Sequence, residues 1–197
     1  MTSIEITKPF KNLKQYTRIC IPPKYLNSDI RNNIKSSLET NLEGRCNING
    51  FIIKIHRIID YSDGFLIPET LNGNVMYNIT YSCNICIPVE NTIIIAQIKI
   101  INQELIIGIN GPIMIFIPKE NVDINIWNIT DGYINKENKR KLQPFDYVLI
   151  QILDKRINRN ETQIKAIGKL LNYALDEDVN KYFKTDTIED LNFLENL

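Results

Sequence analysis

The sequence has no excess of charge, because 23 lysine and arginine residues balance 23 aspartate and glutamate residues in a chain of 197. This balance excludes a protein that binds nucleic acid through a positive field over its whole surface, so any such contact needs a local basic patch. Long apolar runs are also missing. The longest, residues 92–101 and 113–117, are well below the roughly 20 residues that span a bilayer, so no membrane partner is expected.

Catalytic signatures are missing as well. His56 is the only histidine, lies in an apolar run, and has no nucleophile at a recognisable spacing. The sequence contains no nucleophile elbow, P-loop, dinucleotide fingerprint or paired-carboxylate signature. Cys83 and Cys86 have the spacing of zinc ligands, but Cys20 and Cys46 are too scattered to complete a site, which favours buried structural cysteines. We predict no catalytic residue, no metal and no cofactor.

The first residues show no targeting signal, because residues 1–16 alternate apolar and charged positions without the apolar core of a secretory peptide. We therefore expect the protein to stay in a reducing compartment. The composition is skewed toward residues with AT-rich codons, with 38 isoleucines and 25 asparagines against 3 alanines. This skew indicates an AT-rich genome more than a particular fold.

One amphipathic helix is predicted over residues 26–42, where apolar residues recur every fourth position. The periodic residues are Leu26, Ile30, Ile34, Leu38 and Leu42. Ser28 or Asp29 can cap the start, the prolines at 22 and 23 block an earlier one, and Gly44 favours a stop just after the last apolar residue.

Strands are predicted beyond this helix, because the chain becomes dense in β-branched and aromatic residues after Gly50. The expected strands are residues 51–59, 74–86, 92–101, 105–109 and 113–117. The polar stretch at 119–144 indicates a long loop or insertion, and residues 145–153 and 162–170 predict a hairpin. The acidic chain after residue 171 predicts a short helix and a tail, docked on a partner or frayed.

The order of elements predicts an α+β protein with two domains. Residues 1–90 hold one long helix on an antiparallel sheet, and a division is expected near Pro88, because proline breaks the strand ladder. Residues 91–172 have the strand count of an OB-type β-barrel. The acidic residues 173–197 follow as a helix and tail.

Basic residues concentrate in the second domain, with Tyr133, Phe145 and Tyr147 among them. They are Lys136, Lys139, Arg140, Lys141, Lys155, Arg156, Arg159, Lys165 and Lys169. OB barrels bind single strands through positive charge and stacking, which makes this patch a candidate site for nucleic acid. Solvated charges on loops and edge strands remain the alternative.

A glycine-bounded loop carries several apolar residues and is the second candidate site. It runs from Gly64 to Gly73 and contains Phe65, Leu66, Ile67, Pro68 and Leu71. Such residues need burial somewhere, so the loop either packs on its own domain or inserts into a partner.

In linear order these signals resemble one family over residues 18–175. The matching segments are the strand at 19–25, Leu42-Glu43-Gly44 with Cys46 two positions later, Gly50-Phe51-Ile52, the 64–73 loop, the Val75, Tyr77, Ile79, Tyr81 alternation, Pro88, residues 111–117, residues 146–152 and Ala166-Ile167-Gly168. The chain resembles the stalk subunit of DNA-directed RNA polymerase that archaea and eukaryotes share, known in eukaryotes as the seventh subunit of polymerase II. The family usually has Gly-Glu soon after the proline that corresponds to Pro88, whereas this chain has Asn91-Thr92.

The resemblance implies an RNP-like tip domain over 1–90 and an S1-type OB domain over 91–172, without an active site. Gly64, Phe65, Leu66, Ile67, Pro68, Leu71 and Gly73 would then anchor the chain in the polymerase core near the clamp. The implied partners are the largest polymerase subunit, the small clamp-proximal subunit and a second stalk subunit. Lys155, Arg156, Arg159 and Lys165 would contact nascent RNA weakly.

Combined with the AT-rich composition, the resemblance indicates a large DNA virus or an AT-rich protist as the source. A viral protein would act in the virion and the host cytoplasm, and a cellular one in the nucleus. Two other functions remain open from the residues. One is a separate OB-fold protein that binds single-stranded RNA or DNA, and the other is a virion or scaffold protein that makes only protein contacts.

Overall fold

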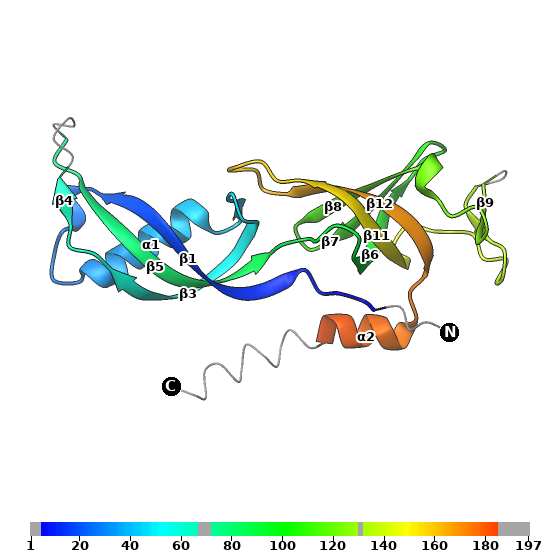
Figure 1. The fold of residues 1–197 in the computed structure, drawn as a ribbon, viewed down its shortest axis with the longest axis horizontal. Helices are drawn as coiled ribbons and strands as arrows, with labels where there is room; N and C mark the ends of the chain where they lie inside the picture. Colours follow the sequence, from blue (N-terminus) through cyan, green and yellow to red (C-terminus); the bar gives the residue numbers. More distant parts are fainter. Residues whose placement is uncertain (1–4, 67–71, 130–131, 185–197) are drawn as a thin grey trace. The chain divides into compact units, whose positions relative to one another are not determined.

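The computed structural model describes residues 5–66, 72–129 and 132–184, which divide into two compact units (Figure 1). The sheet unit contains Phe10–Ile87 and Ile157–Gln163. The barrel unit contains residues 5–9, Pro88–Arg156 and the described chain from residue 164 onward. Each unit has its own layers and its own core.

The sheet unit is built on an antiparallel sheet with the strand order β1-β5-β3-β2. The short strand β4 also pairs with β5. The strands are β1 (Phe10–Ile21), β2 (Arg45–Cys46), β3 (Phe51–Tyr61), β4 (Phe65–Leu66) and β5 (Val75–Cys86). The predicted alternation is confirmed along β5, where Ile79, Tyr81 and Cys83 are buried and the residues between them are more exposed.

The first strand starts earlier than the sequence predicts. The family resemblance implies a strand over residues 19–25, but β1 ends at Ile21, and its pairing with β5 runs back without a register shift to Phe10. Only Ile19 and Ile21 of β1 are buried, and polar residues interrupt the rest of the strand, so its apolar pattern is too weak to reveal it. Pro22 then ends the strand, because proline cannot donate to the ladder.

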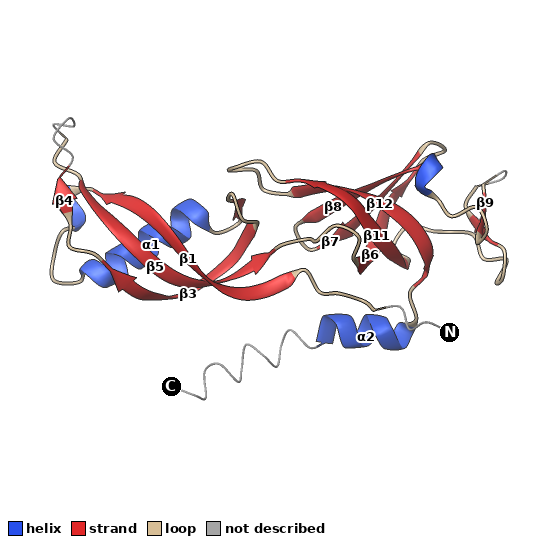
Figure 2. Cartoon of the chain, viewed as in Figure 1, coloured by secondary structure: helices blue, strands red, loops and turns tan. Residues whose placement is uncertain are grey.

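Helix α1 (Ile30–Leu42) covers one face of this sheet (Figure 2), where its Ile34 and Leu38 are fully buried. The helix begins four positions later than the predicted residue 26. A short 3-10 helix, η1 (Pro23–Tyr25), comes first, and the Asn27 side chain accepts a hydrogen bond from the Asp29 amide at 3.0 Å. The turn from Asn27 to Asp29 therefore takes up residues that the periodicity assigns to the helix. The predicted stop at Gly44 is confirmed, with φ +71°.

The barrel unit is a closed five-stranded barrel with the order β11-β12-β8-β7-β6. Its strands are β6 (Ile93–Ile101), β7 (Leu105–Asn110), β8 (Ile113–Pro118), β11 (Tyr147–Arg156) and β12 (Ile164–Tyr173). Only the β12–β8 pair among these is parallel, and β11 and β12 form the predicted hairpin. The α+β fold class, with an RNP-like sheet and an OB-type barrel, is confirmed.

The connection between β8 and β11 is more ordered than the predicted loop. It contains η2 (Lys119–Asn121), β9 (Trp127–Asn128) and β10 (Ile134–Asn135), and β9 pairs with β10. Trp127 is buried, and its indole Nε1 donates to the Leu171 carbonyl at 2.8 Å. Val122, Tyr133, Asn135 and Leu142 are buried too, so scattered buried side chains hold a segment whose sequence shows no sustained period.

The predicted C-terminal helix is present as α2 (Asp176–Lys184), and it packs on its own barrel. Tyr182 is buried against Ile95 and Leu149. The Asn110 side chain donates to the Tyr182 hydroxyl at 2.9 Å, and this hydroxyl donates to the Thr7 carbonyl at 3.4 Å. Tyr182 thus joins both ends of the described chain to the barrel. The acidic tail at 185–197 lies outside the described residues.

We predict that Tyr182→Ala lowers the free energy of unfolding by about 3 kcal/mol, because it removes a buried aromatic ring. Tyr182→Phe keeps the ring and should cost about 1 kcal/mol for the lost hydroxyl contacts. Phe183→Ala, at a neighbouring position that is 41% exposed, is the control and should cost less than Tyr182→Ala. Urea unfolding measures all three, and equal losses at the two positions would contradict the account.

Candidate functional sites

The first site is the end of the sheet unit at β4 (Figure 1), where the glycine-bounded loop begins. Phe65 and Leu66 pair with Met76 and Val75 of β5. Gly64 makes this close approach possible, since a Cβ at that position would overlap Val75 and lie 2.8 Å from the Tyr77 ring.

The side chains of β4 are exposed although they are apolar. Phe65 is 43% exposed and Leu66 is 62% exposed. Gly73 closes the loop in a left-handed conformation, with φ +68°. The predicted residues Ile67, Pro68 and Leu71 lie outside the described residues. The described part of this loop therefore offers an apolar surface that its own sheet does not cover.

The second site is a groove of about 260 Å³ on the outside of the barrel. Phe116 of β8 and Ile167 of β12 are direct partners across the two strands, and with Ala166 they give the groove an apolar floor. Charged residues of β11 and β12 form its rim: Asp154, Lys155, Arg156 and Lys165. Three of the four predicted RNA-contacting residues thus line one groove.

The basic residues of this rim bring positive charges side by side. Arg156 and Lys165 are direct cross-strand partners, a position in which like charges repel and a bound anion lowers that repulsion. The side chain of Lys155 does not join this pair, because its Nζ donates to the Pro88 carbonyl at 2.7 Å. The pair formed by Arg156 and Lys165 is therefore the candidate for a contact with phosphate.

Arg159, the fourth predicted RNA residue, is not among the groove residues. It lies in the turn Ile157–Gln163, which belongs to the sheet unit. This turn packs on β2, where the Asn160 amide donates to the Cys46 carbonyl at 2.9 Å and the Cys46 amide donates to the Glu161 carbonyl at 2.8 Å. Arg159 therefore belongs to a different unit from the other three residues.

Sequence reasoning missed the floor of the groove. The sequence places Phe116 and Ile167 in strands but does not mark them as site residues. The alternation along β8 carries the missing signal, because Ile115 and Ile117 are buried and Phe116 between them points away from the barrel interior.

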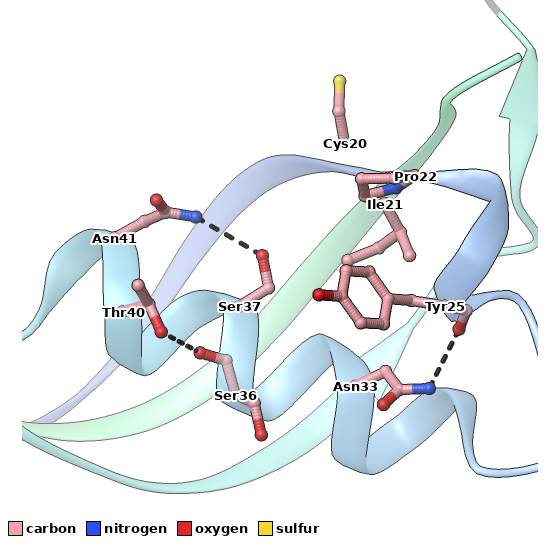
Figure 3. Close-up of a pocket in the computed structure, with 9 residues that line it drawn as sticks. All are labelled: Cys20, Ile21, Pro22, Tyr25, Asn33, Ser36, Ser37, Thr40 and Asn41. Carbon is pink, nitrogen blue, oxygen red and sulfur yellow. Dashed lines mark hydrogen bonds between the residues drawn. The ribbon is translucent and has the colours of Figure 1, made fainter.

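A third hollow, of about 390 Å³, lies between the end of β1 and the polar face of α1 (Figure 3). Its hydroxyl and amide groups bond mainly within the helix. The Thr40 hydroxyl donates to the Ser36 carbonyl at 2.8 Å, and the Asn41 side chain donates to Ser37 Oγ at 3.3 Å. The lining residues include no carboxylate and no histidine, so this hollow has no acid–base pair.

Three of the four cysteines are buried structural residues. Cys46, Cys83 and Cys86 are buried, as expected for the last two, and Cys20 is exposed. Burial raises the pKa of Cys83 to about 11 and that of Cys86 to about 12, with a smaller contribution from Cys46 to the latter.

Neither a metal cluster nor a membrane span is found in the part of the chain that the structure describes. Within residues 5–66, 72–129 and 132–184, no group of three or more histidine, cysteine, aspartate or glutamate side chains could hold a metal ion. Every helix in these ranges is too short or too polar to cross a bilayer.

Comparison with known proteins identifies the family. Residues 17–70 match the model of the SHS2 domain found in the N terminus of Rpb7p, Rpc25p and MJ0397. A putative DNA-directed RNA polymerase subunit of Acanthamoeba polyphaga mimivirus is 31% identical over 166 residues, which cover 84% of this chain and 83% of the relative. The chain belongs to the Rpb7 family of RNA polymerase subunits.

Plant members of the Rpb7 family are more distant relatives. The RNA polymerase II subunit RPB7 of Glycine max is 24% identical over 153 residues, covering 75% of this chain and 84% of the relative. The RNA polymerase II subunit 7 of Arabidopsis thaliana is 23% identical with the same coverage. The match therefore extends over both units of the chain.

Membership of the Rpb7 family confirms the resemblance seen in the sequence. It favours a stalk subunit of a multisubunit RNA polymerase over a separate OB-fold protein. Rpb7-type subunits are non-catalytic accessory subunits, and the chain is one of them. Their partners are found in the polymerase core.

We predict that the free energy of unfolding falls as the pH rises above about 9. The thiols of Cys83 and Cys86 have a pKa near 9.0 when unfolded and a higher pKa when folded, so only the unfolded chain releases protons there. Each thiol contributes a slope of up to about 1.4 kcal/mol per pH unit. Urea unfolding at several pH values measures the slope.

Cys83→Ala should make this slope shallower, whereas Cys20→Ser, at an exposed position, should leave it unchanged. A slope that is equally steep in Cys83→Ala would contradict the assignment to buried thiols.

Proposed function

We propose that this chain is the stalk subunit of a virally encoded, multisubunit DNA-directed RNA polymerase. Its sheet unit would anchor in the core near the clamp, and its barrel unit would meet the emerging transcript. The single observation that carries the proposal is the viral polymerase subunit that matches this chain over 84% of its length. The two candidate surfaces give each unit a separate task.

The anchor is the surface at β4. Phe65 and Leu66 are large apolar side chains that their own sheet leaves exposed. Burying such a side chain in a partner contributes roughly 1.5–3 kcal/mol. We place this surface against the largest polymerase subunit and the small clamp-proximal subunit, where the loop would act as a wedge that favours a closed clamp during promoter opening.

The RNA contact is the groove beside Arg156 and Lys165. Its rim supplies positive charge, and Phe116 on its floor supplies an aromatic surface. This combination favours weak, salt-sensitive and sequence-tolerant binding of a single strand. A second stalk subunit is a further partner in this proposal.

The site of action follows from the source of the polymerase. A relative from a virus that carries its own polymerase subunit supports transcription in the virion and the host cytoplasm. Relatives from plants correspond to the alternative, a nuclear polymerase subunit.

We predict that Phe65→Asp combined with Leu66→Asp releases the chain from the polymerase, because burying unpaired charge costs several kcal/mol. Tagged chains are purified from the native system, and the large polymerase subunits are quantified by mass spectrometry. Ile48→Asp is the control, since Ile48 is 86% exposed in the same unit and lies outside the proposed anchor. Full recovery of the polymerase with the double variant would remove the anchor from the proposal.

We predict that Arg156→Glu combined with Lys165→Glu leaves assembly intact and lowers RNA cross-linking to the chain at least several-fold. Arg159→Glu tests the residue outside the groove and should have the smaller effect. Lys11→Glu combined with Lys14→Glu, on β1, is the matched charge control. Unchanged cross-linking in the groove variant would mean that these residues are only a solvated face.

A further inference from the structure

Phe145 combines a strained backbone with an exposed ring. Its φ is +75°, in the left-handed region that bulky residues rarely adopt. Its side chain is 65% exposed, so burial does not compensate for the strain. A costly conformation that holds an aromatic ring in solvent indicates a contact made by the ring with something outside the chain.

Backbone hydrogen bonds hold Phe145 in this conformation. The Phe145 amide donates to the Ile98 carbonyl at 2.7 Å, and the Ile98 amide donates to the Asp146 carbonyl at 2.9 Å. The Asp146 carboxylate also accepts from the Gln143 amide at 2.9 Å. The ring is therefore presented from a fixed turn beside β6.

One lysine lies over this ring, and two more line the hollow beside it. Lys99 Nζ lies 5.1 Å from the ring centroid. Pro144, the preceding residue, lines a hollow of about 930 Å³ that also contains Lys119 and Lys141. Lys119 pairs with Glu104 at 3.5 Å, whereas no carboxylate in the described chain pairs with Lys99 or Lys141.

The hollow is formed by the β6–β7 turn and the β8–β11 connection, and its lining is mostly polar. Asn102, Gln103 and Gln143 line it, and the Tyr133 hydroxyl donates to the Gln103 carbonyl at 3.0 Å. In OB barrels the loop between the first two strands is one of the loops that bind oligonucleotides. An apolar protein surface would be poorly matched to this lining, whereas phosphates and bases suit it.

We propose that Phe145, Lys99 and Lys141 form a binding site for single-stranded RNA, separate from the groove at Arg156 and Lys165. A base stacks on the Phe145 ring, and the two lysines contact phosphates. The site deepens the proposed function, because it rests on RNA contact by the barrel unit and lengthens the path of the strand over it.

The test uses the full chain and a fluorescein-labelled single-stranded oligouridine of about 12 nucleotides, which spans an OB-fold site. Phe145→Asn removes the ring but keeps a residue that tolerates the left-handed region. We expect the Kd to rise roughly five- to a hundred-fold, the value of one stacked base, with an unchanged or higher melting temperature. Phe145→Trp should retain the affinity.

Ile124→Asn is the matched control, because Ile124 is also 65% exposed and lies in the same connection. It should leave the Kd unchanged. Lys99→Gln and Lys141→Gln should each weaken binding and reduce the slope of log K against log salt by about one.

Several results would overturn the proposal. The first is that the unmodified chain does not bind the oligouridine at about 50 mM salt. The second is that Phe145→Asn leaves the Kd unchanged, and the third is that Ile124→Asn loses as much affinity as Phe145→Asn. Loss of polymerase subunits from Phe145→Asn at unchanged RNA affinity would assign the ring to a protein contact instead. The variant Arg156→Glu with Lys165→Glu is titrated in the same way to separate the two sites. If only this variant weakens binding, RNA binds in the groove and the Phe145 site is contradicted.

Discussion

Closure of the barrel depends on the fit of one isoleucine between two glycines. Ile150 of β11 is fully buried, and it faces Gly108 of β7 and Gly168 of β12. A Cβ at Gly168 would overlap Ile150 and lie 2.8 Å from Ile115, so only glycine lets the strands come this close. The other inward positions are filled mainly by isoleucine, which packs densely on a pleated surface.

A barrel closed in this way leaves its outer face and its loops for binding. Inward residues alternate with outward ones, so Phe116 and Ile167 are presented between buried neighbours. The turn that returns the chain to β11 carries Phe145, and α2 covers a different part of the surface through Tyr182. The rigid strands thus position the groove residues, and a loop supplies the exposed ring of Phe145.

The sequence predicts the strands well where apolar alternation is strong, as in β5 and β8, and where glycine or proline marks an end. It fails at β1, whose exposed polar side chains carry little pattern, and at the start of α1, where the side chain of Asn27 accepts from the Asp29 amide in place of the predicted first helical turn. Charged candidates could be named from composition. Their grouping could not, because it depends on the register of the β11–β12 hairpin, which shifts at two places and sets Arg156 opposite Lys165, whereas Arg159 is not among the groove residues.

The central claim is that the sheet unit anchors this chain in a polymerase core. Electron cryomicroscopy of the polymerase purified from its native system tests it most directly. The account predicts density for the chain with β4 and the adjoining loop buried against the core, and with the barrel groove open toward the RNA exit. A chain held to the core only through its barrel, or a complete polymerase without the chain, would contradict it.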